Sequence, residues 1–130
     1  MNDDSLYQNT SMLAFVGDAA YTLRVRLRVS ACGTLRSERL HRDATRYVCA
    51  SAQARAMRAL FDALPEAEQR LVKRARNKRS ATRPKNADPL DYKWATAFEA
   101  LLGHYCLTGQ TERLDAAAAA AMRIIDAAER

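Results

Sequence analysis

The chain has 130 residues, a mass of 14.5 kDa and a formal net charge of +6. This length allows one domain with a single modest core, and a hydrophobic content of 48% argues against a disordered chain. No apolar run approaches the roughly 20 residues of a membrane-spanning helix, and the polar start MNDDSLYQNT is unlike a secretory signal.

The hydrophobic pattern predicts helices along nearly the whole chain. The first, from Ser11 to Val29, has apolar residues on two sides, which is typical of a helix at the centre of its fold. Gly33 follows it and is expected to stop it. Two further helical stretches are predicted, one that starts near Ser37 and one over residues 51–64.

The second half of the chain continues this pattern. Pro65 is expected at the start of a short basic helix in LPEAEQRLVKRAR. Residues 77–91 contain two prolines and no apolar period, which predicts a loop of a length often found in functional loops. The last helices are predicted over residues 93–107 and 112–129. We therefore expect an all-α fold, with residues 1–130 forming a single domain.

The positive charge is concentrated in one segment. Between Gln69 and Ala87 there are eight Lys or Arg residues and no Asp or Glu, so this segment carries +8 and the remainder of the chain −2. Such a patch is typical of a surface that binds a polyanion, most often nucleic acid. The alternative is a solvated basic loop that only aids solubility.

Two acids, Asp18 in LAFVGDAAY and Glu99 in ATAFEALLG, lie inside apolar stretches that are predicted to be helical. A carboxylate that faces a packed interior needs a cation, a partner charge or several donors. Two such acids in one small domain suggest a shared site for a hard divalent cation such as Mg²⁺, which binds through oxygen. The alternative is that each acid pairs with a buried arginine, for example Arg24 or Arg46.

Glycines accompany both acids. Gly17 precedes Asp18, and Gly103 follows Glu99 by four residues. Because glycine within a helix costs stability, we expect another helix or a ligand to approach the backbone closely there. A carboxylate pair beside a phosphate-binding patch is the arrangement for metal-assisted phosphodiester hydrolysis, although neither feature is specific alone.

Several segments resemble the ribonuclease III family. Its signature helix has a hydrophobic-Gly-Asp step, present here as Val16-Gly17-Asp18, and its second acidic helix corresponds to TAFEALLG. The segments LHRDATRYVCASAQA, KRARNKRSATRPKNAD and YKWATAFEALLGHYCL resemble the small bacterial members called Mini-ribonuclease III, in the same order. The resemblance covers roughly residues 12–107.

This resemblance implies an all-helical catalytic domain that acts as a homodimer on double-stranded RNA with Mg²⁺ and leaves 5′-phosphates. Asp18 and Glu99 fall on the family's metal-binding positions. Two further acids of full-length ribonuclease III are replaced by Ala14 and Thr96, which is typical of the Mini form and implies a thin metal shell. The implied substrate is a stem of precursor 23S ribosomal RNA, with a ribosomal protein as a conceivable further partner.

The resemblance includes no double-stranded RNA-binding domain, so RNA affinity is expected from the catalytic domain, chiefly through its basic segment. Thr82 and Gln53 have suitable chemistry for contacts with 2′-hydroxyl groups. The candidate RNA-binding residues are Lys73, Arg76, Lys78, Arg79, Arg83, Lys85 and Asn86.

Two rival functions stay open. A catalytically silent RNA-binding protein would bind a duplex without cutting it, and the replacements Ala14 and Thr96 keep this alternative alive. A helical adaptor for other proteins would not bind RNA at all. For a dimer interface, Phe61 and Leu64 are candidate exposed apolar residues.

The remaining residues give weaker signals. Cys32, Cys49 and Cys106 have no zinc-ligand spacing and are expected to be free thiols of a cytoplasmic protein. Trp94 and Tyr105, which lie on one predicted helix, are expected in the core or in a dimer contact.

Overall fold

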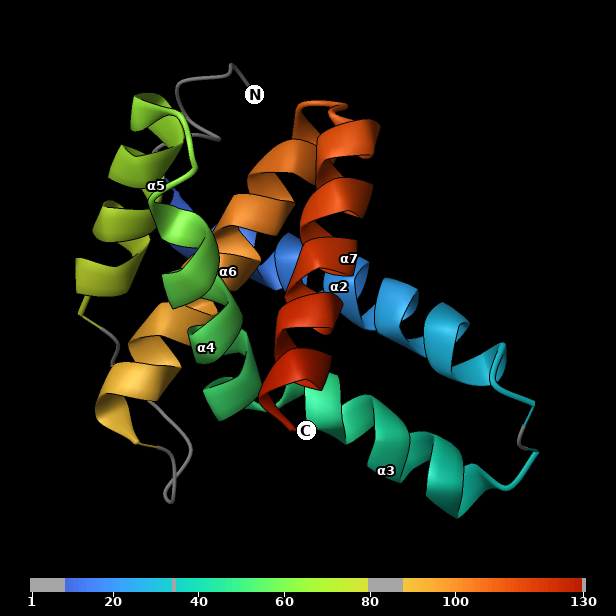
Figure 1. Ribbon diagram of the computed structural model, residues 1–130. Coiled ribbons are helices and arrows are strands. Elements are labelled where there is room, and N and C mark those ends of the chain that lie inside the picture. Colours follow the sequence, from blue (N-terminus) through green and yellow to red (C-terminus); the bar gives the residue numbers. More distant parts are fainter. Residues whose placement is uncertain (1–8, 34, 80–87, 130) are drawn as a thin grey trace.

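The computed structural model describes residues 9–33, 35–79 and 88–129, and every regular element within these ranges is an α-helix (Figure 1). The all-α prediction is confirmed. None of the helices in these ranges has the length and apolar character to cross a membrane. The helices are α2 (Thr10–Ser30), α3 (Ser37–Val48), α4 (Ala50–Phe61), α5 (Glu66–Asn77), α6 (Pro89–Leu107) and α7 (Thr111–Ala128).

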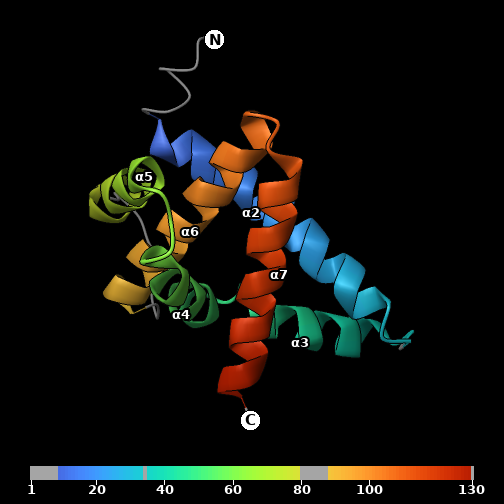
Figure 2. The same ribbon diagram turned by 45° about the horizontal axis from the view of Figure 1, so that its top comes forward.

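Helix α6 is the centre of the fold and packs against α2, α4, α5 and α7. Its central position follows from its sequence, because the stretch from Ala95 to Tyr105 is apolar nearly all round and its large side chains Phe98, Leu101 and Leu102 are fully buried. Helix α5 lies at one side of the molecule, and the turn between α2 and α3 lies at the other (Figures 1 and 2).

The backbones of α2 and α6 touch where the two helices cross. A Cβ atom on Gly17 would lie 1.7 Å from the carbonyl oxygen of Glu99, and one on Gly103 would lie 1.8 Å from the carbonyl oxygen of Leu13. No side chain fits at either position. The predicted close approach is therefore confirmed, and the group that approaches is a helix.

Helix α6 begins at Pro89, four residues earlier than predicted. The Asp88 carboxylate accepts hydrogen bonds from the backbone N–H groups of Leu90 and Asp91, at 2.9 and 3.0 Å, and so caps the helix. Pro89 occupies the first helical turn, where its missing N–H costs nothing. The predicted loop over residues 77–91 is shorter as a result.

Other boundaries differ by a few residues. Helix α4 ends at Phe61, where the prediction placed its end at Leu64, because tight backbone bonds close a turn there, such as Leu64 N–H to Phe61 O at 3.1 Å. Gly33 follows the end of α2 with a φ of 88°, a left-handed conformation that suits glycine. All three cysteines are free thiols, as predicted.

Only one side of α2 is buried by this chain. Leu13, Tyr21 and Val25 are fully buried against the core, whereas Leu23 and Leu27 are 55% and 60% exposed. The prediction of a helix with two apolar sides inside the fold therefore holds for only one side, which carries Leu13, Tyr21 and Val25. The second side leaves an apolar surface uncovered.

The two residues predicted as exposed apolar contacts lie elsewhere. Phe61 and Leu64 are half-buried and pack against the core. Phe61 also meets the ring of Trp94 edge-on, with 6.1 Å between the ring centroids. These side chains therefore contribute to the fold of one chain, and the expectation that they are exposed is wrong, whereas their role in an interface stays a prediction. Tyr105 is buried in the core, as predicted.

The glycine crossing yields a stability prediction. Gly17→Ala should lower the free energy of unfolding by about 3 kcal/mol or more, because the added methyl group overlaps a backbone carbonyl that can move only if the helices separate. Chemical denaturation followed by circular dichroism measures the change.

A matched control adds an atom where there is room. Ala116→Ser, at an exposed position of α7, should change the free energy of unfolding by less than about 0.5 kcal/mol. A Gly17→Ala protein as stable as this control would contradict the crossing.

Candidate active site

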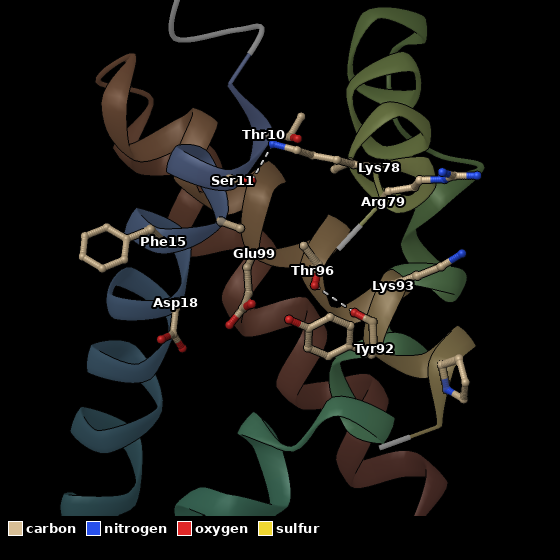
Figure 3. A pocket seen from close by; sticks show the side chains of 13 residues that line it. Thr10, Ser11, Phe15, Asp18, Lys78, Arg79, Tyr92, Lys93, Thr96 and Glu99 are labelled. Carbon is tan, nitrogen blue, oxygen red and sulfur yellow. Dashed lines mark hydrogen bonds between the residues drawn. The ribbon is translucent and has the colours of Figure 1, made fainter. Parts of the chain in front are cut away.

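The crossing brings the two predicted acids together. Asp18 follows Gly17 on α2, and Glu99 is the residue on α6 whose carbonyl oxygen faces Gly17. Their carboxyl groups point toward one another (Figure 3). Asp18 is exposed and Glu99 is half-buried, so the expectation that both face a packed interior is wrong. Asp18 lies at the edge of the buried face of α2, where its carboxylate stays in contact with solvent.

Glu99 has an unusual pKa. Burial is the largest cause and raises it, the hydrogen bond and the negative charge of Asp18 raise it further, and a hydrogen bond with Gln53 lowers it. The resulting pKa is about 8, well above the ordinary value of 4.5. Without a cation, Glu99 therefore keeps its proton near neutral pH, and a positive ion bound between the two carboxyl groups would favour its ionised form.

Gln53 supports Glu99 from inside the protein. Its side chain is only 3% exposed, and its Nε2 donates to the carbonyl oxygen of Val48 at 2.9 Å. The prediction that Gln53 contacts RNA is therefore wrong. Its Oε1 has no hydrogen-bond partner among the described residues. The sequence did contain a signal for the buried role of Gln53, because the residue lies on an apolar helix face, where a polar side chain needs a specific partner.

The alternative of buried acid–arginine pairs fails for both arginines that were considered. Arg24 pairs with Asp115 at 2.7 Å, and Arg46 pairs with Glu129 and Asp126 near the end of α7. No ion pair within the described ranges involves Asp18 or Glu99. Asp18 and Glu99 therefore lie next to each other, and no lysine or arginine side chain in the described ranges forms an ion pair with either of them.

A cavity of about 490 Å³ contains both acids and three basic residues. Lys78 and Arg79 approach it from the end of α5, and Lys93 belongs to the first turns of α6 (Figure 3). Lys78 Nζ also donates to Ser11 Oγ at 2.6 Å, which ties the end of α5 to the start of α2. A cavity with carboxylates at one side and cations at the other can hold a metal ion and a phosphate together.

The predicted RNA-binding residues fall into three groups. Lys78 and Arg79 line the cavity. Lys73 and Arg76 lie over aromatic rings instead, with Lys73 Nζ 5.7 Å from the Phe61 ring centroid and the Arg76 guanidinium 4.9 Å from that of Trp94. The last group, together with Thr82, lies outside the described residues: Arg83, Lys85 and Asn86.

The positions of the two missing acids are part of the same cavity. Ala14 and Thr96 both line it, and the Thr96 hydroxyl donates to the Tyr92 carbonyl oxygen at 2.9 Å. No cluster of three or more His, Cys, Asp or Glu residues suited to a metal occurs in the described ranges. The candidate metal ligands among the described residues are therefore the two carboxyl groups alone.

Among the cavity residues that sequence reasoning missed are Tyr92 and Lys93. Tyr92 lies seven residues before Glu99 on the same helix, a spacing that returns to the same face. This spacing from Glu99 is the sequence signal that could have found it. Lys93 lies outside the basic segment, and only the fold places it at the cavity.

Comparisons with known proteins identify the family of the chain. The model of the Ribonuclease III domain family matches residues 11–110. The chain belongs to the ribonuclease III family. Its membership confirms the sequence prediction of an endoribonuclease, and the activity of this family is directed at double-stranded RNA.

Curated relatives within the family carry the name Mini-ribonuclease 3. The chain is 48% identical over 106 residues to that of Brevibacillus brevis, which covers 82% of this chain and 79% of the relative. It is 46% identical over 114 residues to that of Symbiobacterium thermophilum, with 88% of each chain covered. A crystal structure of a protein from Fusobacterium nucleatum matches with a TM-score of 0.77 at 27% identity, over 85% of this chain and 88% of that one.

The pKa of Glu99 predicts how stability depends on pH. Between pH 4.5 and about 8 the folded protein keeps a proton that the unfolded chain has lost, so the protonated site makes stability fall as pH rises through this range. Glu99→Gln removes this loss. In EDTA the variant should therefore be more stable than the unmodified protein at pH 8, by about 1 to 3 kcal/mol.

Urea denaturation at pH 5 and pH 8 tests this prediction, and the gain should be much smaller at pH 5. Glu112→Gln, a change at an exposed carboxylate in the first turn of α7, serves as the control. An equal gain at both pH values would show that Glu99→Gln acts through packing and not through its proton.

Proposed function

We propose that the cavity is the active site, where Asp18 and Glu99 hold Mg²⁺ and an RNA strand is hydrolysed. The observation that carries this proposal is the convergence of two carboxyl groups from different helices in a cavity that also contains Lys78, Arg79 and Lys93. Neither a silent RNA-binding surface nor a protein adaptor requires such a pair.

The donor set suits a hard divalent cation. Both groups are carboxylates, and the ionised pair lacks a positive partner among the described side chains, so a bound cation would relieve their repulsion. Magnesium keeps several of its waters in protein sites, which is compatible with two protein ligands supplemented by water and phosphate oxygens.

In the proposed mechanism, each wall of the cavity has its own task. Lys78, Arg79 and Lys93 bind phosphate groups and orient the strand. Asp18 and Glu99 hold the cation, which when bound supplies an activated water and stabilises negative charge on the phosphoryl group. Water adds to phosphorus and the bond to the 3′ oxygen breaks, so the products carry 5′-phosphates and 3′-hydroxyl groups.

The wider RNA surface combines the cavity with the basic segment. Contacts of Lys and Arg with phosphates give affinity that falls steeply with salt and reads little sequence. Lys73 and Arg76 on α5 extend the positive surface away from the cavity. Arg83, Lys85 and Asn86 complete the proposed set from outside the described residues.

The active form is proposed to be a homodimer. Phe15, Leu23 and Leu27 lie at intervals of eight and four residues along α2 and are 80%, 55% and 60% exposed. A helix that presents such a row without a partner in its own chain is suited to packing against a second copy. Two copies would supply one acidic site for each strand of a duplex.

The proposed substrate is a stem in precursor 23S ribosomal RNA, cut on both strands by residues 1–130 acting as one catalytic domain in the cytoplasm. Support comes from the similarity to proteins named Mini-ribonuclease 3 over most of the chain. A ribosomal protein bound to the stem is compatible with this proposal.

Cleavage of a labelled RNA duplex tests the catalytic pair. Asp18→Asn and Glu99→Gln should each lower the Mg²⁺-dependent rate by at least about 100-fold, because the loss of a metal ligand removes several kcal/mol of transition-state stabilisation. Asp62→Asn, at an exposed acid beside α4, should cleave at the rate of the unmodified protein.

Circular dichroism and duplex binding in Ca²⁺ show whether each variant is folded. Binding without cleavage by the unmodified protein would support the silent RNA-binding alternative, and the absence of RNA binding would support the adaptor.

The apolar row on α2 predicts the oligomeric state. Leu23→Glu and Leu27→Glu should each weaken self-association by at least about 100-fold, because an unpaired charge within an apolar interface costs several kcal/mol. Analytical ultracentrifugation measures the change. Leu35→Glu makes the same substitution at a residue that is 93% exposed and lies outside the row, and this variant should remain dimeric. An unmodified protein that is monomeric at micromolar concentration would contradict the proposal.

A further inference from the structure

Tyr92 lies at the centre of the cavity without an evident structural task. It comes from α6, is half-buried and lines the cavity together with both acids. Its ring extends from the helix into the cavity, and its hydroxyl group points toward Glu99 (Figure 3). The backbone at Tyr92 is held by the helix and by the Thr96 hydroxyl, which donates to its carbonyl oxygen at 2.9 Å.

The hydroxyl group of Tyr92 differs from those of the other described tyrosines. Tyr21 donates to the Tyr47 carbonyl oxygen at 3.1 Å, Tyr47 donates to Asp126 at 2.6 Å, and Tyr105 donates to Glu68. No hydrogen bond of the Tyr92 hydroxyl occurs within the described ranges. A tyrosine hydroxyl that is partly withdrawn from water usually has a partner, so this donor is available for a molecule that enters the cavity.

The position of this donor indicates its partner. The phenol lies beside Glu99 in a cavity that Lys78, Arg79 and Lys93 also line, with Lys78 reaching Ser11 and the charged ends of Arg79 and Lys93 pointing away from the acids (Figure 3). A phosphate bound at a cation between the two carboxyl groups would lie in the same cavity as this hydroxyl, which points toward Glu99. A neutral O–H group suits this position, because it can donate to a phosphate oxygen without adding a charge that would compete with a cation for the two carboxyl groups.

We propose that the Tyr92 hydroxyl donates a hydrogen bond to a non-bridging oxygen of the scissile phosphate. This inference rests on the proposed function of the cavity. Negative charge grows on the non-bridging oxygens as water adds to phosphorus, so a donor fixed at this position stabilises the transition state more than the bound substrate. Tyr92 is thus a substrate-contacting catalytic residue that acts beside the metal ligands.

The test is Tyr92→Phe, which removes one oxygen atom and keeps the ring. Single-turnover cleavage of an RNA duplex at saturating protein and Mg²⁺ should slow by at least about tenfold, since removal of one preorganised donor to developing charge costs on the order of 100-fold or more in oxyanion sites. The duplex dissociation constant in Ca²⁺ should change less than about threefold, because many phosphate contacts share the binding.

Tyr47→Phe is the matched control. It removes the same oxygen from a tyrosine that donates to Asp126 on α7, so it should lower the thermal midpoint and leave the cleavage rate within about twofold. Tyr92→Phe should show the opposite pattern, with an unchanged midpoint and slower cleavage. A merely structural role for Tyr92 would move the midpoint together with the rate.

Two results would overturn the inference while the proposed function stands. One is cleavage by Tyr92→Phe within about twofold of the unmodified protein, with Asp18→Asn inactive in the same assay. The other is a loss of Mn²⁺ affinity in Tyr92→Phe, measured by titration calorimetry without RNA, because it would assign the hydroxyl to Glu99 and not to phosphate. A failure of the unmodified protein to cleave would overturn the proposed function and this inference together.

Discussion

The direct backbone contact between α2 and α6 is the constraint on which the candidate site depends. Gly17 faces the carbonyl oxygen of Glu99, so the residue that closes the crossing also carries one of the two carboxyl groups. Asp18 is the next residue after that glycine. Because the acids are attached to the crossing itself, their separation is set by backbone contact and not by the rotamers of long side chains. A larger residue at Gly17 or Gly103 would change the packing and the candidate site in a single step.

This arrangement places two carboxyl groups, which would repel each other if both were ionised, beside a well-packed centre. The apolar surface of α6 offsets the cost of holding Glu99 next to Asp18, and Gln53 gives its carboxyl group a donor from the buried side. Arg24 and Arg46 do not neutralise the pair, since they are engaged with Asp115 and Asp126 of α7. The site is therefore kept in a state that a cation can improve, which is typical of functional sites that are not optimised for stability.

The helical fold, the glycine crossing and the two acids could be predicted from the sequence, because each is visible as a pattern of residues within a single predicted helix. It did not distinguish which apolar side of α2 is covered by its own chain, since a pattern of Leu and Phe is the same for a core and for an interface. Gln53 was misjudged for a related reason, because its burial depends on α6 and not on its neighbours in sequence. The basic segment was found as one block, but the end of α5 divides it between the cavity and a surface with aromatic rings.

Phe15 belongs to two surfaces at once. It lines the cavity beside Asp18, and it also begins the exposed apolar row of α2. A second copy seated on that row would come within one side chain of the candidate catalytic acids and would remove water from one rim of the cavity. Assembly would then alter the local dielectric around Asp18, so that the electrostatics of the active site would become a function of protein concentration through mass action.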